Sequence, residues 1–291
     1  MIKRLLFRLL PSSIVNRLQR FKLSLDLKKT YQAVPFTIAD LPQGDLRSTY
    51  ARDDEMKSAP YRKTMRKLLS YHGAGPVGPK KHWEYPWVLA NLEMRPGLKV
   101  LDAGCGRAPI QFVLADLGMD LTAIDPFENV GWHGIDRRLS EKYGIKINYR
   151  VEGMEKISFP DETFDRVVSV SVIEHCRAVG VKNEIKVPQV DADRVLQGKM
   201  MKEMARVLKK GGLLIVTVDF LFPKGGVVLE SNVHIKNLVE SSGLFLLNGE
   251  LKNDLYGYNG FQIERLMRQP NLVVQSYSGV TGTSIGFIFR K

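Results

Sequence analysis

A short acidic and glycine-rich segment is the first place in the sequence where chemistry could occur. Asp102 ends a run of apolar residues, and Gly104 and Gly106 follow it closely. Glycine lacks a Cβ, so the backbone can turn tightly and approach a ligand, and a helix N-terminus offers free N–H groups to a carboxylate or phosphate. The segment is typical of a loop that binds a nucleotide-like ligand, although a plain strand-to-helix turn has the same composition.

A second acid, Asp125, ends the next apolar run, about 20 residues after the glycines. A carboxylate in this place can bind both hydroxyls of a ribose. Dinucleotides and S-adenosylmethionine (SAM) both carry a ribose, so Asp125 fits either ligand. The third glycine of a dinucleotide loop would stand where this chain has Pro109, which argues against a dinucleotide.

Alternating strands and helices must position these residues. We expect strands at 98–102, 120–124, 146–151, 166–170, 213–218, 244–247 and 285–290, and helices at 82–92, 108–117, 136–142, 199–209 and 233–241. This order predicts an α/β fold with a seven-stranded, mostly parallel sheet, an antiparallel last strand, flanking helices and an N-terminal helical extension. Ligands of such a sheet bind at the carboxyl ends of its strands.

Two further motifs separate the ligand classes. One is the segment 152–165, which runs into the strand Arg166–Val170 and then Ser171 to His175, and the other is Met204 to Gly212 before the next strand. Together with the glycine loop and the second acid, these motifs resemble the class I SAM-dependent methyltransferase superfamily, over residues 83 to 220. The branch most similar contains ubiquinone-biosynthesis and sugar or natural-product methyltransferases. The resemblance implies a Rossmann-like fold and SAM as cofactor.

The resemblance also implies roles for the acidic and glycine residues. Asp102, Gly104 and Gly106 match the loop that holds the methionine end of SAM, and Asp125 matches the ribose-binding acid. The usual third glycine of the family is replaced by Ala108, which is small enough to be tolerated.

The adenine contact departs from the family pattern. Many members have an aspartate where this chain has Gly153, so the contact must come from the Met154 backbone, Glu155 or Glu152; we assign it to Met154 and Glu155. Ser171 matches the strand end beside the reacting methyl group.

Glu174 and His175 are the candidate catalytic residues. A methyl group on a sulfonium is already reactive, so catalysis needs placement of the acceptor and, for a hydroxyl, removal of its proton. An imidazole suits this task near neutral pH. The alternative is that both side chains brace the next segment. Ubiquinone-type relatives hold a divalent metal with such a pair and an acid at the place of Ser171, so we expect no metal here. Cys105 and Cys176 receive no chemical role.

Two segments could select the acceptor. His82 to Trp87 is aromatic, and Arg177 to Lys199 is longer than the connection expected there. The alternatives are core packing for the tryptophans and a solvated insertion for the charges.

Residues 1–30 form a basic leader that holds more than half of the net charge of +12. Two short amphipathic helices are expected there, the second with Ile14, Leu18, Phe21 and Leu25 on one face. This pattern suits the surface of an anionic membrane, but also docking on the same chain or on a partner. We expect a loop-rich connector at 31–80 and the methyltransferase domain at 81–291, with an insertion at about 177–199. Nothing resembles an export signal or a spanning helix, so we expect a cytoplasmic protein, peripheral to a membrane if the leader binds one.

The predicted function is methyl transfer from SAM to a small molecule, at a hydroxyl of a sugar, glycolipid precursor or secondary metabolite. RNA or protein methylation is the second alternative. The charge outside the leader is modest, which does not favour nucleic acid. A non-catalytic partner subunit with this fold is the third alternative. Neither the acceptor atom nor the oligomeric state follows from the sequence.

Overall fold

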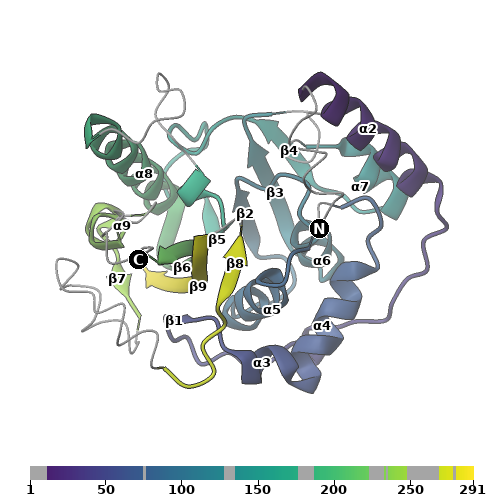
Figure 1. The fold of residues 1–291 in the computed structure, drawn as a ribbon, viewed down its shortest axis with the longest axis horizontal. Coiled ribbons are helices and arrows are strands. Elements are labelled where there is room, and N and C mark those ends of the chain that lie inside the picture. The colour runs from purple at the N-terminus through teal and green to yellow at the C-terminus, as the bar shows by residue number, and fades with distance from the viewer. Residues whose placement is uncertain are drawn as a thin grey trace.

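One mixed β-sheet runs through the protein. The computed structural model describes residues 12–74, 77–127, 135–175, 187–222, 233, 235–247, 269–277 and 280–291. The sheet has the strand order β1-β9-β6-β5-β2-β3-β4, and β7 and β8 also pair with β9 (Figure 1). The strands are β1 (Thr49–Tyr50), β2 (Lys99–Ala103), β3 (Asp120–Asp125), β4 (Asn148–Val151), β5 (Phe164–Val170), β6 (Leu208–Phe222), β7 (Phe245–Leu246), β8 (Gln275–Tyr277) and β9 (Val280–Arg290).

The pairing confirms the predicted fold class. Strands β2 to β6 run parallel, and β9 lies antiparallel beside β6. The central strands are buried on both faces, as in Leu213 to Val216, and this is why they appear in the sequence as continuous apolar runs. The strands β1 and β8 add to the seven that were expected. Each has only two or three residues, too few for a periodic pattern.

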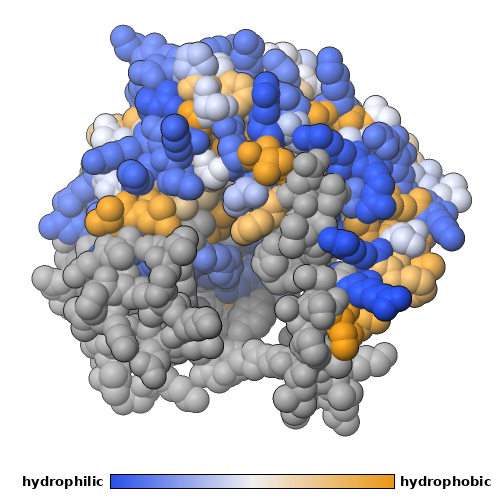
Figure 2. Space-filling view, turned by 90° about the horizontal axis from the view of Figure 1, so that it is seen from above, coloured by the Kyte–Doolittle hydropathy of each residue, from blue (hydrophilic) through white to orange (hydrophobic). Residues whose placement is uncertain are grey.

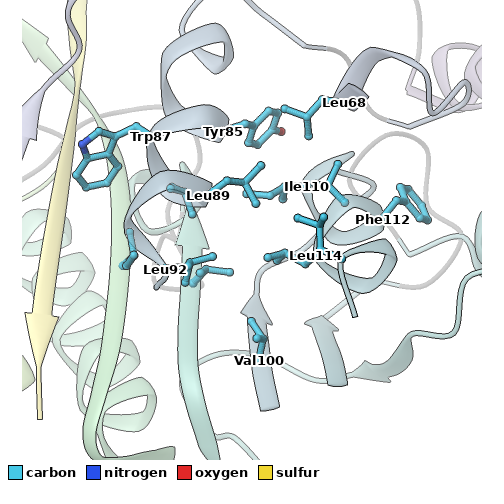
Figure 3. Packing of buried hydrophobic residues seen from close by; sticks show 14 of the residues in the cluster. Leu68, Tyr85, Trp87, Leu89, Leu92, Val100, Ile110, Phe112 and Leu114 are labelled. Atoms are coloured by element: carbon cyan, nitrogen blue, oxygen red, sulfur yellow. The ribbon is translucent and has the colours of Figure 1, made fainter. Parts of the chain in front are cut away.

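Helices cover both faces of the sheet. They are α2 (Ser12–Lys28), α3 (Asp53–Lys57), α4 (Ala59–Leu69), α5 (Lys81–Asn91), α6 (Ile110–Asp116), α7 (Arg137–Tyr143), α8 (Val187–Val207) and α9 (Ile235–Ser242), with short 3-10 turns at Ile38–Asp40 and Ile173–His175. One apolar cluster joins α4, α5 and α6 to the sheet; in Figure 3, Leu89 of α5 and Leu92 just after it lie opposite Ile110 and Leu114 of α6. A second cluster joins α8 and α9 to the opposite face.

The segment 31–80 is more ordered than the expected loop-rich connector. It contains α3, α4 and the edge strand β1. The Ser58 hydroxyl caps α4 by accepting from the Tyr61 N–H, and Met65 and Leu68 are buried. The outer face of α4 is polar, so the sequence pattern did not distinguish this amphipathic helix from the loops around it. The division into leader, connector and domain stays a prediction.

The predicted insertion at 177–199 lies partly outside the described residues. From Val187 onward the chain is already helical and forms the first half of α8. Within the described ranges, no helix combines the length and apolar character that crossing a bilayer requires.

Candidate active site

The glycine loop leaves β2 in a left-handed backbone conformation. Gly104 has φ +77° and Gly106 has φ +47°, values that favour glycine. The N–H groups of Gly104 and Cys105 both donate to the Ile124 carbonyl, at 2.9 and 3.0 Å. A Cβ on Gly104 would lie 2.4 Å from Val172 Cγ1. Gly104 is therefore required both by its φ and by the close approach of the segment after β5.

Asp125 is tied to the same loop at the end of β3. Its Oδ2 accepts from the Gly106 N–H at 3.0 Å, and its Oδ1 accepts from the Phe127 N–H at 3.0 Å. Burial raises the pKa of Asp125, and these two backbone bonds oppose the rise. The carboxylate is thus held in one orientation before any ligand binds.

Asp102 is the more deeply buried acid. It is 2% exposed, and its Oδ2 has no hydrogen-bond partner among the described residues. Burial, with a contribution from the charge of Asp125, raises the pKa of Asp102 to about 7. A buried acceptor without a partner costs free energy unless a ligand supplies a donor.

The segment after β4 carries the residues predicted to contact adenine. Met154 is buried, and its sulfur accepts a hydrogen bond from the Ser169 hydroxyl at 3.7 Å, whereas Glu155 is exposed. Glu152 accepts from the Ser158 N–H through Oε2, and its buried Oε1 has no partner within the described ranges. The orphaned atom makes Glu152 a stronger candidate for a ligand contact than the exposed Glu155.

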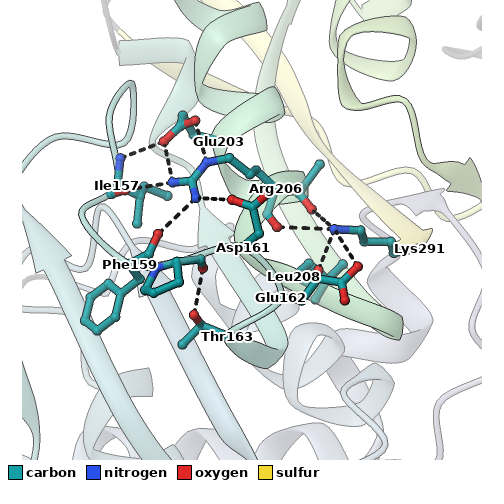
Figure 4. A network of polar contacts seen from close by, with 11 residues as sticks. Ile157, Phe159, Asp161, Glu162, Thr163, Glu203, Arg206, Leu208 and Lys291 are labelled. Atoms are coloured by element: carbon teal, nitrogen blue, oxygen red, sulfur yellow. Dashed lines mark hydrogen bonds and ion pairs between the residues drawn. The ribbon is translucent and has the colours of Figure 1, made fainter.

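Arg206 braces this segment from α8. Its guanidinium donates to the carbonyls of Ile157 and Phe159 at 2.8 and 2.9 Å, and pairs with Asp161 at 2.7 Å and with Glu203 at 2.9 Å (Figure 4). Two motifs that are far apart in the sequence are thereby joined. These contacts of Arg206 hold the loop after β4 in place.

Ser171 contacts helix α5. It has φ +51°, its N–H donates to the Thr217 carbonyl at 2.9 Å, and its hydroxyl donates to Glu84 Oε1 at 2.7 Å. Glu84 is fully buried and pairs with Lys81 at 2.6 Å. Burial alone would raise the pKa of Glu84, but the Lys81 ammonium holds the pKa of this carboxyl below its ordinary value. The Ser171 side chain therefore faces a buried ion pair.

Glu174 and His175 lie on the 3-10 turn after β5. The buried Glu174 accepts from the Asp219 N–H at 3.0 Å, and burial, then the charge of Asp219, raises the pKa of Glu174 to about 8. The His175 side chain is 70% exposed, and its Nε2 lies 4.0 Å from Glu174 Oε1. Desolvation lowers the pKa of His175 despite the attraction of Asp219. These shifts favour a protonated acid beside a neutral imidazole.

Asp219 is a site residue that sequence reasoning missed. One ligand atom each from Glu174, His175 and Asp219 lie within 4.8 Å of one another, as a divalent-cation site would require. Lys80 Nζ already lies 2.6 Å from Asp219 Oδ2 and pairs with it. Asp219 directly follows the predicted strand 213–218, as Asp102 and Asp125 end theirs. An acid next to the end of a predicted strand is the sequence signal by which Asp219 could have been identified.

The proposed acceptor-selecting aromatics belong to the core. Trp83 and Trp87 are 0% and 2% exposed and stack with their ring centroids 5.0 Å apart. A Cβ on Gly286 of β9 would lie 2.4 Å from the Trp87 ring. The packing alternative is therefore correct for these two residues. Cys176 and residues 177–186 lie outside the described residues.

The predicted site residues gather at one edge of the sheet. Asp102, Asp125, Met154, Ser171 and Glu174 all stand at or just after the carboxyl ends of parallel strands. Figure 2 shows the molecule from above, which is the side toward which β2 and β3 point in Figure 1. On this side there is a hollow with hydrophilic residues at its floor.

Comparisons with known proteins agree with this geometry. Residues 101–216 match a family model described as a methyltransferase domain. A ubiquinone biosynthesis O-methyltransferase from Methylocella silvestris is 44% identical over 80 residues, 27% of this chain and 30% of that protein. The human mitochondrial ubiquinone biosynthesis O-methyltransferase is 29% identical over 187 residues, 56% of this chain and 46% of that protein. The chain spans about a third to a half of these curated relatives.

Among solved structures, a protein from Bacillus halodurans described as a putative methyltransferase matches with a TM-score of 0.48 and 16% identity, over 72% of this chain and 98% of that one. Residues 101–216, less than half of the chain, thus match a methyltransferase domain, and the matched segments resemble the O-methyltransferases of ubiquinone biosynthesis. S-adenosylmethionine is the cofactor expected of such a domain.

The residues at the strand ends fit this cofactor. The orphaned Asp102 Oδ2 can accept from an ammonium group such as that of the methionine end, and the fixed Asp125 carboxylate keeps lone pairs for two ribose hydroxyls. The residue-by-residue assignments of the sequence analysis stay predictions.

Proposed function

We propose that the protein transfers a methyl group from SAM to a hydroxyl of a small molecule. The observation that carries this proposal is the place of His175, whose imidazole is 70% exposed on the turn after β5 and lies 4.0 Å from Glu174, at the same sheet edge as Asp125. A base that is neutral at physiological pH is what a hydroxyl acceptor requires. The relatives are named O-methyltransferases, which agrees with oxygen as the acceptor atom.

In this mechanism, bound SAM supplies an electrophilic methyl group on a sulfonium. Asp102 and the glycine loop would hold the methionine end, Asp125 would hold the ribose, and the segment around Met154 would contact adenine. His175 would take the proton of the acceptor hydroxyl as that oxygen accepts the methyl group. The buried, protonated Glu174 fixes the turn that presents His175, because it bridges to the Asp219 backbone.

The acceptor class includes a sugar, a glycolipid precursor or a secondary metabolite. We further propose that the protein works in a reducing compartment such as the cytoplasm, at the surface of an anionic membrane bound by residues 1–30. The free, buried Cys105 agrees with a reducing compartment.

The acceptor can be identified by offering SAM labelled on its methyl group together with separated lipid, glycan, RNA and protein pools. We expect label in the lipid or glycan pool, on oxygen. Label in RNA or protein would contradict the proposal. No label in any pool, from a protein that binds SAM in solution, would favour a non-catalytic subunit.

A further inference from the structure

Helix α2 carries apolar residues on two opposite sides. Leu23 is 5% exposed, and Leu27 is partly buried beside it. The residues that the sequence analysis had placed on one apolar face are instead exposed: Ile14 by 43%, Leu18 by 43%, Phe21 by 62% and Leu25 by 47%. At about 100° per residue, these four form one stripe, and Leu23 lies on the opposite side of the helix. We call the four residues the outer stripe.

The inner side of α2 is anchored to the domain. Leu23 and Leu139 of α7 belong to the same apolar cluster and meet beside Gly73. The Lys142 ammonium, also on α7, donates to the carbonyl of Asp26 at 2.6 Å. These contacts fix the rotation of α2 about its axis. Docking on the chain itself, one of the alternatives for this helix, therefore uses the inner side and leaves the outer stripe facing away.

Basic residues border the outer stripe. Arg17 and Lys28 lie on one side of it and Lys22 on the other, each within about 70° of its centre, and all three are exposed. The helix has one acid, Asp26, which pairs with Lys29 at 2.6 Å. An apolar stripe with cations on both sides matches the surface of a bilayer with anionic lipids, which is apolar inside and anionic at its border.

We propose that the outer stripe of α2 inserts into the interfacial region of an anionic phospholipid membrane, with Arg17, Lys22 and Lys28 at the headgroups. This rests on the membrane part of the proposed function and names the surface that carries it. Charge argues against two other occupants. A second copy would bring two basic helices together, and residues 1–11 carry Lys3, Arg4 and Arg8 without an acid.

The position of α2 relates this surface to the candidate active site. In Figure 1, α2 lies at the upper edge of the molecule, next to α7 and on the side to which β2 and β3 point their carboxyl ends. Figure 2, which shows that side, has hydrophobic side chains exposed between hydrophilic ones on its right-hand part. A membrane bound by the outer stripe would therefore lie on the same side of the protein as the strand ends.

The test is co-sedimentation of the full chain with phosphatidylcholine vesicles, with and without phosphatidylglycerol. We expect pelleting only with the anionic vesicles, weakened by salt. Phe21→Ser should lower the partition coefficient about tenfold, and Arg17→Gln and Lys22→Gln about fivefold each. Phe245→Ser is the matched control, because Phe245 is also 62% exposed but stands on strand β7. It should pellet like the unmodified protein.

Several results would overturn the proposal. These are equal pelleting with and without vesicles, equal binding to neutral and anionic vesicles, or a Phe21→Ser variant that binds normally while removal of residues 1–11 abolishes binding. A dimer that Phe21→Ser dissociates, without vesicle binding, would assign the stripe to a second copy. SAM binding and methyl transfer are measured on the same preparations. Loss of methyl transfer with vesicle binding intact would count against the proposed reaction and not against this surface.

Discussion

The backbone N–H of Gly106 donates to Asp125 Oδ2 at 3.0 Å, so the glycine loop and the acid at the end of β3 form one unit. The loop contributes the turn and the free N–H groups, and the acid fixes the loop while presenting its remaining lone pairs. Because Asp125 is oriented by two backbone donors, a ligand with two hydroxyls meets a carboxylate that needs no rearrangement.

Gly104→Ala should destabilise the protein through both backbone strain and a clash with Val172. We expect a loss of about 1–3 kcal/mol from overpacking, in addition to about 1–2 kcal/mol for the positive φ. Gly97→Ala is the matched control, since Gly97 has φ +84° and none of the described atoms lies within 4 Å of its Cβ position. Urea midpoints measure both, and Gly104→Ala with Val172→Ala should recover the overpacking part. Equal losses for the two glycines would refute the close approach.

Because the buried Glu174 carboxyl loses its proton as the pH rises, the free energy of unfolding should decrease. Its pKa in the folded state, about 8, is above the ordinary value of 4.5. Between these values the folded state keeps a proton that the unfolded state releases, so the free energy of unfolding decreases with pH, by at most about 1.4 kcal/mol per unit. Glu174→Gln mimics the protonated form, and urea unfolding at pH 5.5 and 8 should show a flatter dependence.

Glu203→Gln is the control for this pH dependence. The Arg206 guanidinium holds the pKa of Glu203 below its ordinary value, so this carboxyl is ionised in both states over the same window. The variant should lose stability without a change in slope. An unchanged slope in Glu174→Gln would mean that Glu174 is ionised in the folded protein.

His175→Ala should slow methyl transfer about 100-fold or more, the usual loss for a general base, without weakening SAM binding. In the unmodified protein the pKa of His175 is below 6.5, so the rate should be constant above pH 7 and fall under more acidic conditions. His72→Ala removes an exposed histidine outside the site and should have no effect. A variant with normal turnover would leave His175 as a structural residue only.

Methyl transfer should not require a divalent metal. Glu174, His175 and Asp219 are close enough to bind one, but Lys80 already pairs with Asp219, and burial raises the pKa of Glu174 to about 8. Dialysis against EDTA should leave the rate unchanged, and added Mg²⁺ should not raise it. If EDTA abolished the activity and Mg²⁺ restored it, Lys80 would have to leave Asp219 when the metal binds.

The parallel core of the fold could be predicted from the sequence because its strands are continuous apolar runs with an acid at their ends. Asp102 and Asp125 were found for that reason. Their role as ligand-binding residues is still inferred from the family. Glu152 was only one of three possible adenine contacts until its buried, unpartnered oxygen distinguished it from Glu155.

Other features depend on contacts that no local pattern encodes. Asp219 meets Glu174 across 45 residues, and Ser171 meets Glu84 across 87. The tryptophans of α5 were compatible with either a pocket or the core, and only the packing of Trp87 over β9 decided between them. Helix α2 was expected to have one apolar face, but Leu23 on the opposite side is the residue that docks.

Calorimetric titration of the full chain with SAM measures directly whether the strand ends form a cofactor site. We expect one site in the unmodified protein. We also expect an affinity about 100-fold lower in Asp125→Ala, since charge-assisted hydrogen bonds contribute about 1.5–3 kcal/mol each. Asp120→Ala, an exposed acid at the other end of the same strand, should bind normally. No binding heat in the unmodified protein, or equal affinity in Asp125→Ala, would contradict a SAM site built from the glycine loop and this acid.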